Sequence, residues 1–257
     1  MILRALPALL VLAAVGCAVD ATEDVRQARA AKVVGDTNEL VAVAADGSNL
    51  APKYRRTLDA FGLMRFDDGR NHCTVTHVGG GVVVTAGHCF DAPRTRTDDV
   101  ACPDAGTRGY AIAWGYRQDR EPYLTSTCER ILSMQHTGDT DYAIFRVSPA
   151  PVAAVRPELT ARPKLGATVT IFSHPSHRPL EWSQTCTVQP LPVDASIGGS
   201  EFLHECDTEP ASSGATVLDD ATLAVVGIHD GAWHDKNYAT YLADTPLREL
   251  LGALGTH

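Results

Sequence analysis

The chain has 257 residues, 44% of them hydrophobic, and a formal net charge of −9 at pH 7. This length fits one domain or two small domains and is ample for a sizeable core. The acidic balance, with no basic stripe, excludes nucleic acid as a partner, because nucleic-acid binding relies on clustered Lys and Arg.

The first 17 residues carry the pattern of an export signal. Arg4 precedes the apolar run Leu6–Val15, which is too short to span a bilayer as a permanent helix. Cys17 resembles the acylated cysteine of the bacterial lipobox, although Ala14 stands where a leucine is usual. Ordinary cleavage near Ala18 is the alternative. We expect an exported protein, extracellular or anchored to the cell envelope only through a lipid at Cys17.

Residues 18–32 are small, polar and charged, with no apolar periodicity. This composition predicts a tether or a short propeptide. The folded domain is expected over 33–257.

Short runs rich in β-branched residues, separated by Gly, Pro and Asp, follow from Phe61 onward. This spacing predicts an all-β barrel or sandwich. A Pro-containing stretch at 148–163 divides the runs into halves of about 60–150 and about 164–243. An N-cap candidate, Pro246 in the first turn and Gly252 at the end predict a closing helix over about 245–254. The expected strands include 73–76, 82–85, 110–114, 142–147, 167–172, 185–188, 216–218 and 223–229.

Three short motifs supply the parts of an acyl-transfer catalyst. His88 follows the apolar run 81–84 and precedes a cysteine, Asp141 opens the apolar run 142–145, and Ser213 is followed by Gly214. A hydroxyl becomes a useful nucleophile when a base takes its proton and a carboxylate fixes the tautomer of that base. We therefore predict Ser213 as nucleophile, His88 as general base and acid, and Asp141 as the orienting carboxylate. Asp139 and Ser212 are the rival residues.

The order His88, Asp141, Ser213 resembles that of the secreted serine endopeptidases of the chymotrypsin and trypsin superfamily. The resemblance reaches from about Val33 to Leu251. It implies two six-stranded antiparallel β-barrels of the chymotrypsin type with a C-terminal helix, and the three residues on the cleft between the barrels. The motif at 32–35 resembles the activation junction of this superfamily, which makes Val33 a candidate mature N-terminus; a plain first strand is the alternative.

The resemblance implies an oxyanion hole built from the backbone N–H groups of Ala211 and Ser213. The superfamily normally has glycine where Ala211 stands. A left-handed alanine costs roughly 1 to 2 kcal/mol, whereas a lost oxyanion donor costs about 2.7 to 4 kcal/mol of transition-state stabilisation. We expect a strained but working hole. A catalytically silent binding or scaffold protein is the alternative.

The sequence before Ser213 looks more like the bacterial glutamyl endopeptidase branch. That resemblance implies that Thr208 and His229, with the mature N-terminal amine, hold an acidic P1 side chain. A hydroxyl donor, a partly protonated imidazole and an ammonium suit a buried carboxylate. Asp207, six residues before Ser213, would instead select Arg or Lys, as an acid at that spacing does in trypsin. We expect Glu or Asp at P1. The alternatives are an Arg/Lys preference and an interior, ligand-free role for His229.

Seven cysteines are present, and removal of Cys17 with the leader leaves six, which suits three disulfides in an oxidising compartment. The resemblance implies a bridge that encloses the histidine loop. Two further cysteines, Cys186 and Cys206, lie in the half that carries Ser213 and are expected to pair with each other. The two cysteines that remain, Cys102 and Cys128, then form the third bridge. The expected bridges are Cys73–Cys89, Cys186–Cys206 and Cys102–Cys128.

No cofactor is implied, because the sequence has no nucleotide loop, EF-hand spacing or zinc motif. We expect no metal ligand set. The expected partner is a peptide or protein substrate, and the expected assembly is a monomer.

Overall fold

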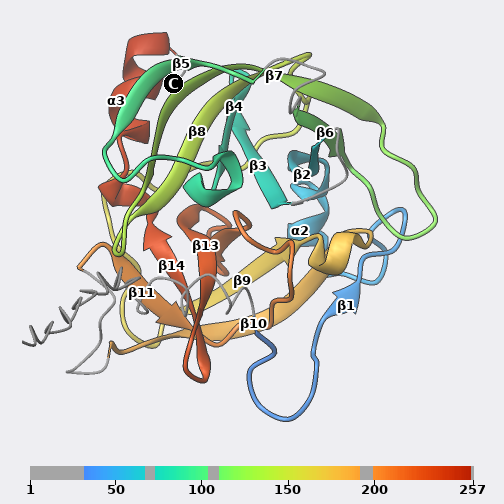
Figure 1. Cartoon of the computed structure of the whole chain (residues 1–257). Coiled ribbons are helices and arrows are strands. Elements are labelled where there is room, and N and C mark those ends of the chain that lie inside the picture. Colours follow the sequence, from blue (N-terminus) through green and yellow to red (C-terminus); the bar gives the residue numbers. More distant parts are fainter. Residues whose placement is uncertain (1–31, 67–72, 104–109, 192–198, 256–257) are drawn as a thin grey trace, which may run out of the picture.

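The computed structural model describes residues 32–66, 73–103, 110–191 and 199–255. The predicted export signal, with Cys17, and the tether up to residue 31 lie outside the described residues. The chain forms two closed antiparallel β-barrels, and Figure 1 shows the first barrel above the second. The all-β, two-barrel prediction is confirmed.

The first barrel closes six strands in the order β7-β6-β2-β3-β4-β8, with β7 paired to β8 and the short strand β5 added outside β7. Val82–Thr85, between the turn at 79–81 and His88, is buried throughout, as expected of a β-branched run. The strands are β2 (Phe61–Phe66), β3 (Cys73–Gly79), β4 (Val82–Thr85), β5 (Thr97–Ala101), β6 (Tyr110–Trp114), β7 (Leu124–His136) and β8 (Asp141–Ser148).

The second barrel closes six strands in the order β10-β11-β14-β13-β12-β9, with β9 paired to β10. A strand from the N-terminal segment, β1, crosses to pair with β10, so residues before the first barrel dock on the second. The strands are β1 (Val41–Ala42), β9 (Thr168–Ser173), β10 (Glu181–Gln189), β11 (Glu201–His204), β12 (Thr216–Asp219), β13 (Val225–Trp233) and β14 (Lys236–Tyr241).

The two barrels share one interface. The rings of Phe61 and Phe172 stack with their centroids 5.2 Å apart. The hydroxyls of Thr76 and Thr216, which are both buried, lie 2.9 Å apart. A buried polar pair is costly unless it is hydrogen-bonded, and here each hydroxyl satisfies the other across the interface.

Two α-helices complete the fold over the residues that the structure describes. The helix α2 (Pro52–Arg55) precedes the first barrel and was not predicted. The closing helix α3 (Leu247–Leu254) buries Leu247 and Leu251 and ends at Gly255, whose φ of +66° suits a left-handed C-cap. The predicted glycine at 252 lies inside the helix rather than at its end. Within the described ranges, no helix combines the length and apolar character that a membrane crossing needs.

The structure contains the three disulfides expected from the sequence. One ties the start of β3 to the turn that carries His88, a second joins the end of β5 to β7, and a third joins β10 to the segment after β11. Bridges of this kind fit an oxidising, extracellular setting. They are Cys73–Cys89, Cys102–Cys128 and Cys186–Cys206.

Candidate active site

His88 and Asp141 meet because β4 and β8 are neighbours. Thr85 at the end of β4 pairs with Ala143 near the start of β8, and the chain then enters a 3₁₀ turn at Gly87–Phe90. The His88 N–H donates to Asp141 Oδ1 at 2.9 Å, and His88 Nδ1 lies 2.5 Å from Asp141 Oδ2. With the proton on Nδ1, the other ring nitrogen, Nε2, is an acceptor.

Gly87 allows this close approach. A Cβ at Gly87 would lie 2.3 Å from the carbonyl oxygen of Gln135 and 2.9 Å from Asp141 Oδ1. No other residue fits between these atoms without a shift of the backbone. The rival Asp139 lies in the turn between β7 and β8, exposed and bonded to the Thr137 hydroxyl at 2.7 Å. Asp141, not Asp139, therefore contacts His88.

The ion pair fixes the charges of both residues. Burial lowers the pKa of His88, but the charge of Asp141 and its hydrogen bond raise it more, so the pKa lies above its usual value. Burial alone would raise the pKa of Asp141, but the charge of His88 and its hydrogen bonds keep it below its usual value. The pair can thus hold a carboxylate beside an imidazole that gains a proton.

The turn that carries Ser213 packs against the strands that lead to His88. The Thr74 N–H donates to the Ser213 carbonyl at 2.9 Å. Gly214 has a φ of +81°, and a Cβ there would lie 1.9 Å from Thr85 Oγ1 and 2.9 Å from the backbone nitrogen of Ala86. The glycine after Ser213 is therefore required by both conformation and space. These contacts bring the Ser213 turn of the second barrel to the His88 turn of the first.

Ser212 and Ser213 have different surroundings. The Ser212 side chain is completely buried, and its hydroxyl donates to the Ser173 hydroxyl at 3.0 Å. Ser213 keeps 5% of its surface exposed. Ser212 therefore anchors the turn, and Ser213 is the hydroxyl left at the junction of the barrels.

Ala211 adopts the left-handed conformation expected of an oxyanion loop. Its φ is +73°. Its carbonyl accepts from the Thr74 hydroxyl at 3.0 Å, which holds the strained peptide in place. Within the described part of the chain, the N–H groups of Ala211 and Ser213 donate to no protein acceptor, whereas those of Ser212 and Gly214 do. Two free, neighbouring N–H groups are what a developing oxyanion needs.

Asp207 binds the N-terminal segment. Its Oδ1 accepts from the Val34 N–H at 2.7 Å, and its Oδ2 accepts from the Glu39 N–H at 2.6 Å. Asp207 is 3% exposed. Both carboxylate oxygens already accept backbone hydrogen bonds, so Asp207 holds residues 34–39 on the second barrel.

Thr208 lies against Lys32, the first described residue. The Lys32 N–H donates to Thr208 Oγ1 at 3.1 Å, and the Thr208 N–H donates back to the Lys32 carbonyl at 3.1 Å. Asn237 closes the arrangement, since its amide accepts from the Lys32 N–H at 3.0 Å and donates to the Lys32 carbonyl at 2.7 Å. Val33, the candidate N-terminus, therefore follows a residue that is hydrogen-bonded through both backbone groups.

His229 is fully buried on β13. Its Nδ1 lies 3.3 Å from His204 Nε2, and its own Nε2 has no hydrogen-bond partner in the described ranges. Burial and the nearby charge of His88 lower the pKa of His229 to about 3, a shift that a backbone contact with Tyr238 only partly opposes. The imidazole is therefore neutral at pH 7, not partly protonated.

The sequence did not single out several residues that position this site. Thr74 connects the barrels at the Ser213 turn, and Thr85 donates to the Thr74 carbonyl at 2.8 Å. Thr240 accepts from the Asp141 N–H at 2.9 Å, and His204 contacts His229. Each lies on a predicted or observed strand whose composition is ordinary for a β-sheet. No local signal marks them, because each contact joins strands that are far apart in the chain.

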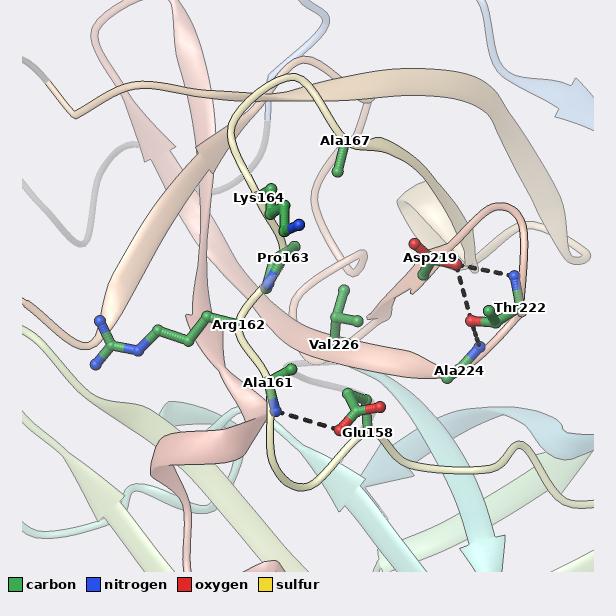
Figure 2. A pocket seen from close by; sticks show the side chains of 10 residues that line it. All are labelled: Glu158, Ala161, Arg162, Pro163, Lys164, Ala167, Asp219, Thr222, Ala224 and Val226. Carbon is green, nitrogen blue, oxygen red and sulfur yellow. Dashed lines mark hydrogen bonds between the residues drawn. The ribbon is translucent and has the colours of Figure 1, made fainter.

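A pocket of about 280 Å³ lies elsewhere on the second barrel, between the loop after 158 and the β12–β13 turn. Figure 2 shows that its carboxylates bond to their own loops, Glu158 to Ala161 and Asp219 to Thr222. None of the candidate catalytic residues lines it. The lining residues are Glu158, Ala161, Arg162, Pro163, Lys164, Ala167, Asp219, Thr222, Ala224 and Val226.

Comparison with solved structures places this fold among serine proteases. A Glu endopeptidase in complex with MPD is 16% identical, covers 87% of this chain and 99% of its own, and has a TM-score of 0.60. Protease Anisep from Arthrobacter nicotinovorans is 15% identical, covers 79% of this chain and 98% of its own, and has a TM-score of 0.61. The thermostable serine protease AL20 from an extremophilic microorganism is 15% identical, with coverages of 79% and 100% and a TM-score of 0.59.

At these identities the likeness shows a shared fold. No curated protein matches the sequence. The family model of the trypsin-like peptidase domain matches residues 73–228, which is more than half of the chain and contains His88, Asp141 and Ser213. The chain therefore belongs to the family of trypsin-like peptidase domains.

Proposed function

We propose that the protein is a serine endopeptidase that hydrolyses peptide bonds through an acyl-enzyme on Ser213. The observation that carries the proposal is the pair of hydrogen bonds from His88 to Asp141, at 2.5 Å from the ring and 2.9 Å from the backbone. They hold the imidazole with Nε2 available as a base.

In this reaction Ser213 Oγ attacks the carbonyl carbon of the scissile peptide, and His88 Nε2 accepts the hydroxyl proton. The same proton passes to the leaving amine, and water then hydrolyses the ester with His88 acting again as base. The free N–H groups of Ala211 and Ser213 would receive the oxyanion. General base catalysis of this kind contributes about 10² to 10⁴ in rate.

We propose an acidic P1 residue as the preferred substrate. Two features support this preference: Asp207 has both oxygens occupied by backbone N–H groups, and His229 has a buried Nε2 with no partner in the described ranges. When His204 Nε2–H donates to His229 Nδ1, the remaining proton of His229 sits on Nε2 and can donate to a carboxylate. We propose the Thr208 hydroxyl, which accepts from the Lys32 N–H at 3.1 Å, as a further donor to that carboxylate.

The test is a peptide library that varies only the P1 residue. We expect hydrolysis after Glu or Asp, and a fall of about 10-fold or more in kcat/KM for such substrates in Thr208→Val, since a hydrogen bond to a charged group contributes about 1.5 to 3 kcal/mol. Thr208→Ser, which keeps the hydroxyl, is the matched control.

Cleavage confined to Arg and Lys, with loss of that preference in Asp207→Asn, would overturn the acidic P1 proposal while leaving the peptidase itself intact. An absence of any hydrolysis by correctly folded protein would instead support the silent scaffold. Mass analysis and N-terminal sequencing of the exported protein decide between an acylated Cys17, cleavage near Ala18 and a free Val33.

A further inference from the structure

A second imidazole, that of His136, lies beside the His88–Asp141 pair. His136 ends β7 and Asp141 begins β8, and the two residues are direct partners in the ladder. A tight turn, in which the Thr137 N–H donates to the Thr140 carbonyl at 2.8 Å, sets this register. Directly opposed residues of an antiparallel pair place their side chains on the same face.

The three side chains form a compact donor set. His136 Nε2 lies 3.9 Å from Asp141 Oδ2, and the rings of His88 and His136 have their centroids 5.7 Å apart. One ligand atom from each of the three side chains lies within 4.8 Å of the other two. The side chains of His88 and His136 are 31% and 34% exposed, so an ion can reach them from solvent, while that of Asp141 is 5% exposed.

Two imidazoles and one carboxylate, with a fourth position open to water, are a ligand set that Zn²⁺ takes at about 2.0 to 2.2 Å per bond. Donors around a tetrahedral ion of that size are about 3.3 Å apart. To bind the ion, the 2.5 Å distance from His88 Nδ1 to Asp141 Oδ2 must lengthen, and the 3.9 Å distance from His136 Nε2 to Asp141 Oδ2 must shorten. Each change is less than about 1 Å, which side-chain rotation supplies.

The other His/Cys groups in the described ranges do not offer such a set. They are Cys73 with His88 and Cys89, and Cys186 with His204 and Cys206. In both groups the cysteines are joined in a disulfide, so neither sulfur is a thiolate.

We propose that His88, His136 and Asp141 form an inhibitory binding site for Zn²⁺. The proposal rests on the proposed peptidase function. When Zn²⁺ takes the Nδ1 lone pair of His88, the single proton of the neutral ring must sit on Nε2. Nε2 then has no lone pair for the Ser213 proton, and Asp141 no longer orients the ring. The Nδ1–H bond of His88 breaks and an Nε2–H bond forms, so the ring stays neutral, and release of the ion reverses this change.

The test uses tag-free protein that has been stripped with a chelator and then titrated with ZnCl₂ during peptide hydrolysis. We expect full inhibition of the native protein and recovery with chelator. His136→Gln removes one ligand without touching the triad, so its basal activity stays close to native. Its inhibition constant rises at least about 10-fold, since even indirect changes at a metal site cost 10- to 100-fold in affinity.

His177→Asn is the matched control, because His177 is an exposed histidine outside the donor set with a φ of +65° that asparagine tolerates. Its inhibition constant stays at the native value. Equal inhibition of native protein and His136→Gln, or no inhibition of the native protein, overturns the proposal.

Calorimetric titration of the Ser213→Ala variant with ZnCl₂ separates the two proposals. One-to-one binding that is lost in Ser213→Ala/His136→Gln establishes the metal site even if the native protein hydrolyses nothing. A protein that hydrolyses peptides but whose Ser213→Ala variant takes up no Zn²⁺ retains the peptidase function and overturns the metal site.

Discussion

His88 is the residue on which the proposed chemistry depends. Its ring is held by Asp141, which raises its pKa above the usual 6.5. The protonated ring cannot accept the Ser213 proton, so activity is lost as pH falls through this pKa. We therefore expect kcat/KM to rise with pH, with a midpoint above 6.5.

The Asp141→Asn variant tests the same link. It removes the charge that raises the His88 pKa, so the midpoint of the pH profile shifts downward. Its kcat falls by about 10⁴-fold, the loss seen when the triad carboxylate is replaced by an amide. Asp139→Asn, a change in the neighbouring turn, leaves the profile as it is. An unchanged profile in Asp141→Asn would contradict the assignment.

Ala211 carries backbone strain that the folded protein tolerates. At a φ of +73° an alanine is strained by roughly 1 to 2 kcal/mol. Glycine removes that strain but loses about 0.5 to 1 kcal/mol of its own to chain entropy. We expect Ala211→Gly to raise the free energy of unfolding by about 0.5 to 1 kcal/mol in urea titrations. Ala215→Gly, at a buried position without positive φ, should lower it; a loss in both variants would contradict the strain.

At the scale of elements, β14 holds the backbone of Asp141 through Thr240. Thr240 accepts from the Asp141 N–H at 2.9 Å and donates to Asp230 Oδ2 at 2.7 Å. Thr240→Val leaves the Asp141 N–H without an acceptor and loosens the carboxylate. We expect kcat to fall about 10-fold, a cost of about 1.4 kcal/mol, with KM nearly unchanged.

Thr240→Ser keeps the hydroxyl and restores kcat. If Thr240→Val only lowers the thermal midpoint and leaves kcat per folded molecule intact, β14 has no role in positioning Asp141. The measurement is steady-state kinetics of both variants at a temperature well below their unfolding transitions.

Strands with a regular apolar composition are predictable from the sequence, whereas strands that depend on pairing with distant segments are not. The predicted runs at 82–85 and 110–114 are strands with the same bounds, because each is apolar and bounded by glycine. The 13-residue strand β7 was missed, since most of its residues are polar or exposed and give no simple alternation.

The sequence points to the candidate catalytic residues because each lies in a short motif next to an apolar run. It does not point to their supports: the contact from Thr240 to Asp141 spans 99 positions, and that from Lys32 to Thr208 spans 176. The place of His136 beside Asp141 depends on the register of a hairpin, which composition does not fix.

At the scale of the whole molecule, a buried carboxyl sets part of the pH dependence of folding. Burial and the charges of Asp141 and Glu201 raise the pKa of Asp230 well above its usual 3.8, so the folded protein releases this proton at a higher pH than the unfolded chain does. An unfolded chain ionises at the ordinary pKa. Stability from this group is therefore present below pH 3.8 and is lost as pH rises above it.

Asp230→Asn replaces the acid with a neutral isostere that still accepts from Thr240. We expect the thermal midpoint of the variant minus that of the native protein to increase as pH rises from 4 to 8. Differential scanning calorimetry across that range measures the difference. A difference that is constant or shrinks with pH would mean that Asp230 is ionised in the fold.

The proposed function requires that the junction of the two barrels activates Ser213. A fluorophosphonate probe reacts only with a serine whose proton a neighbouring base removes, and intact-mass spectrometry followed by peptide mapping reports the labelled residue. We predict a single adduct on Ser213, present in the native protein and in Ser212→Ala and absent from Ser213→Ala and His88→Ala. No adduct on folded native protein, or an adduct that persists in Ser213→Ala, would contradict the account.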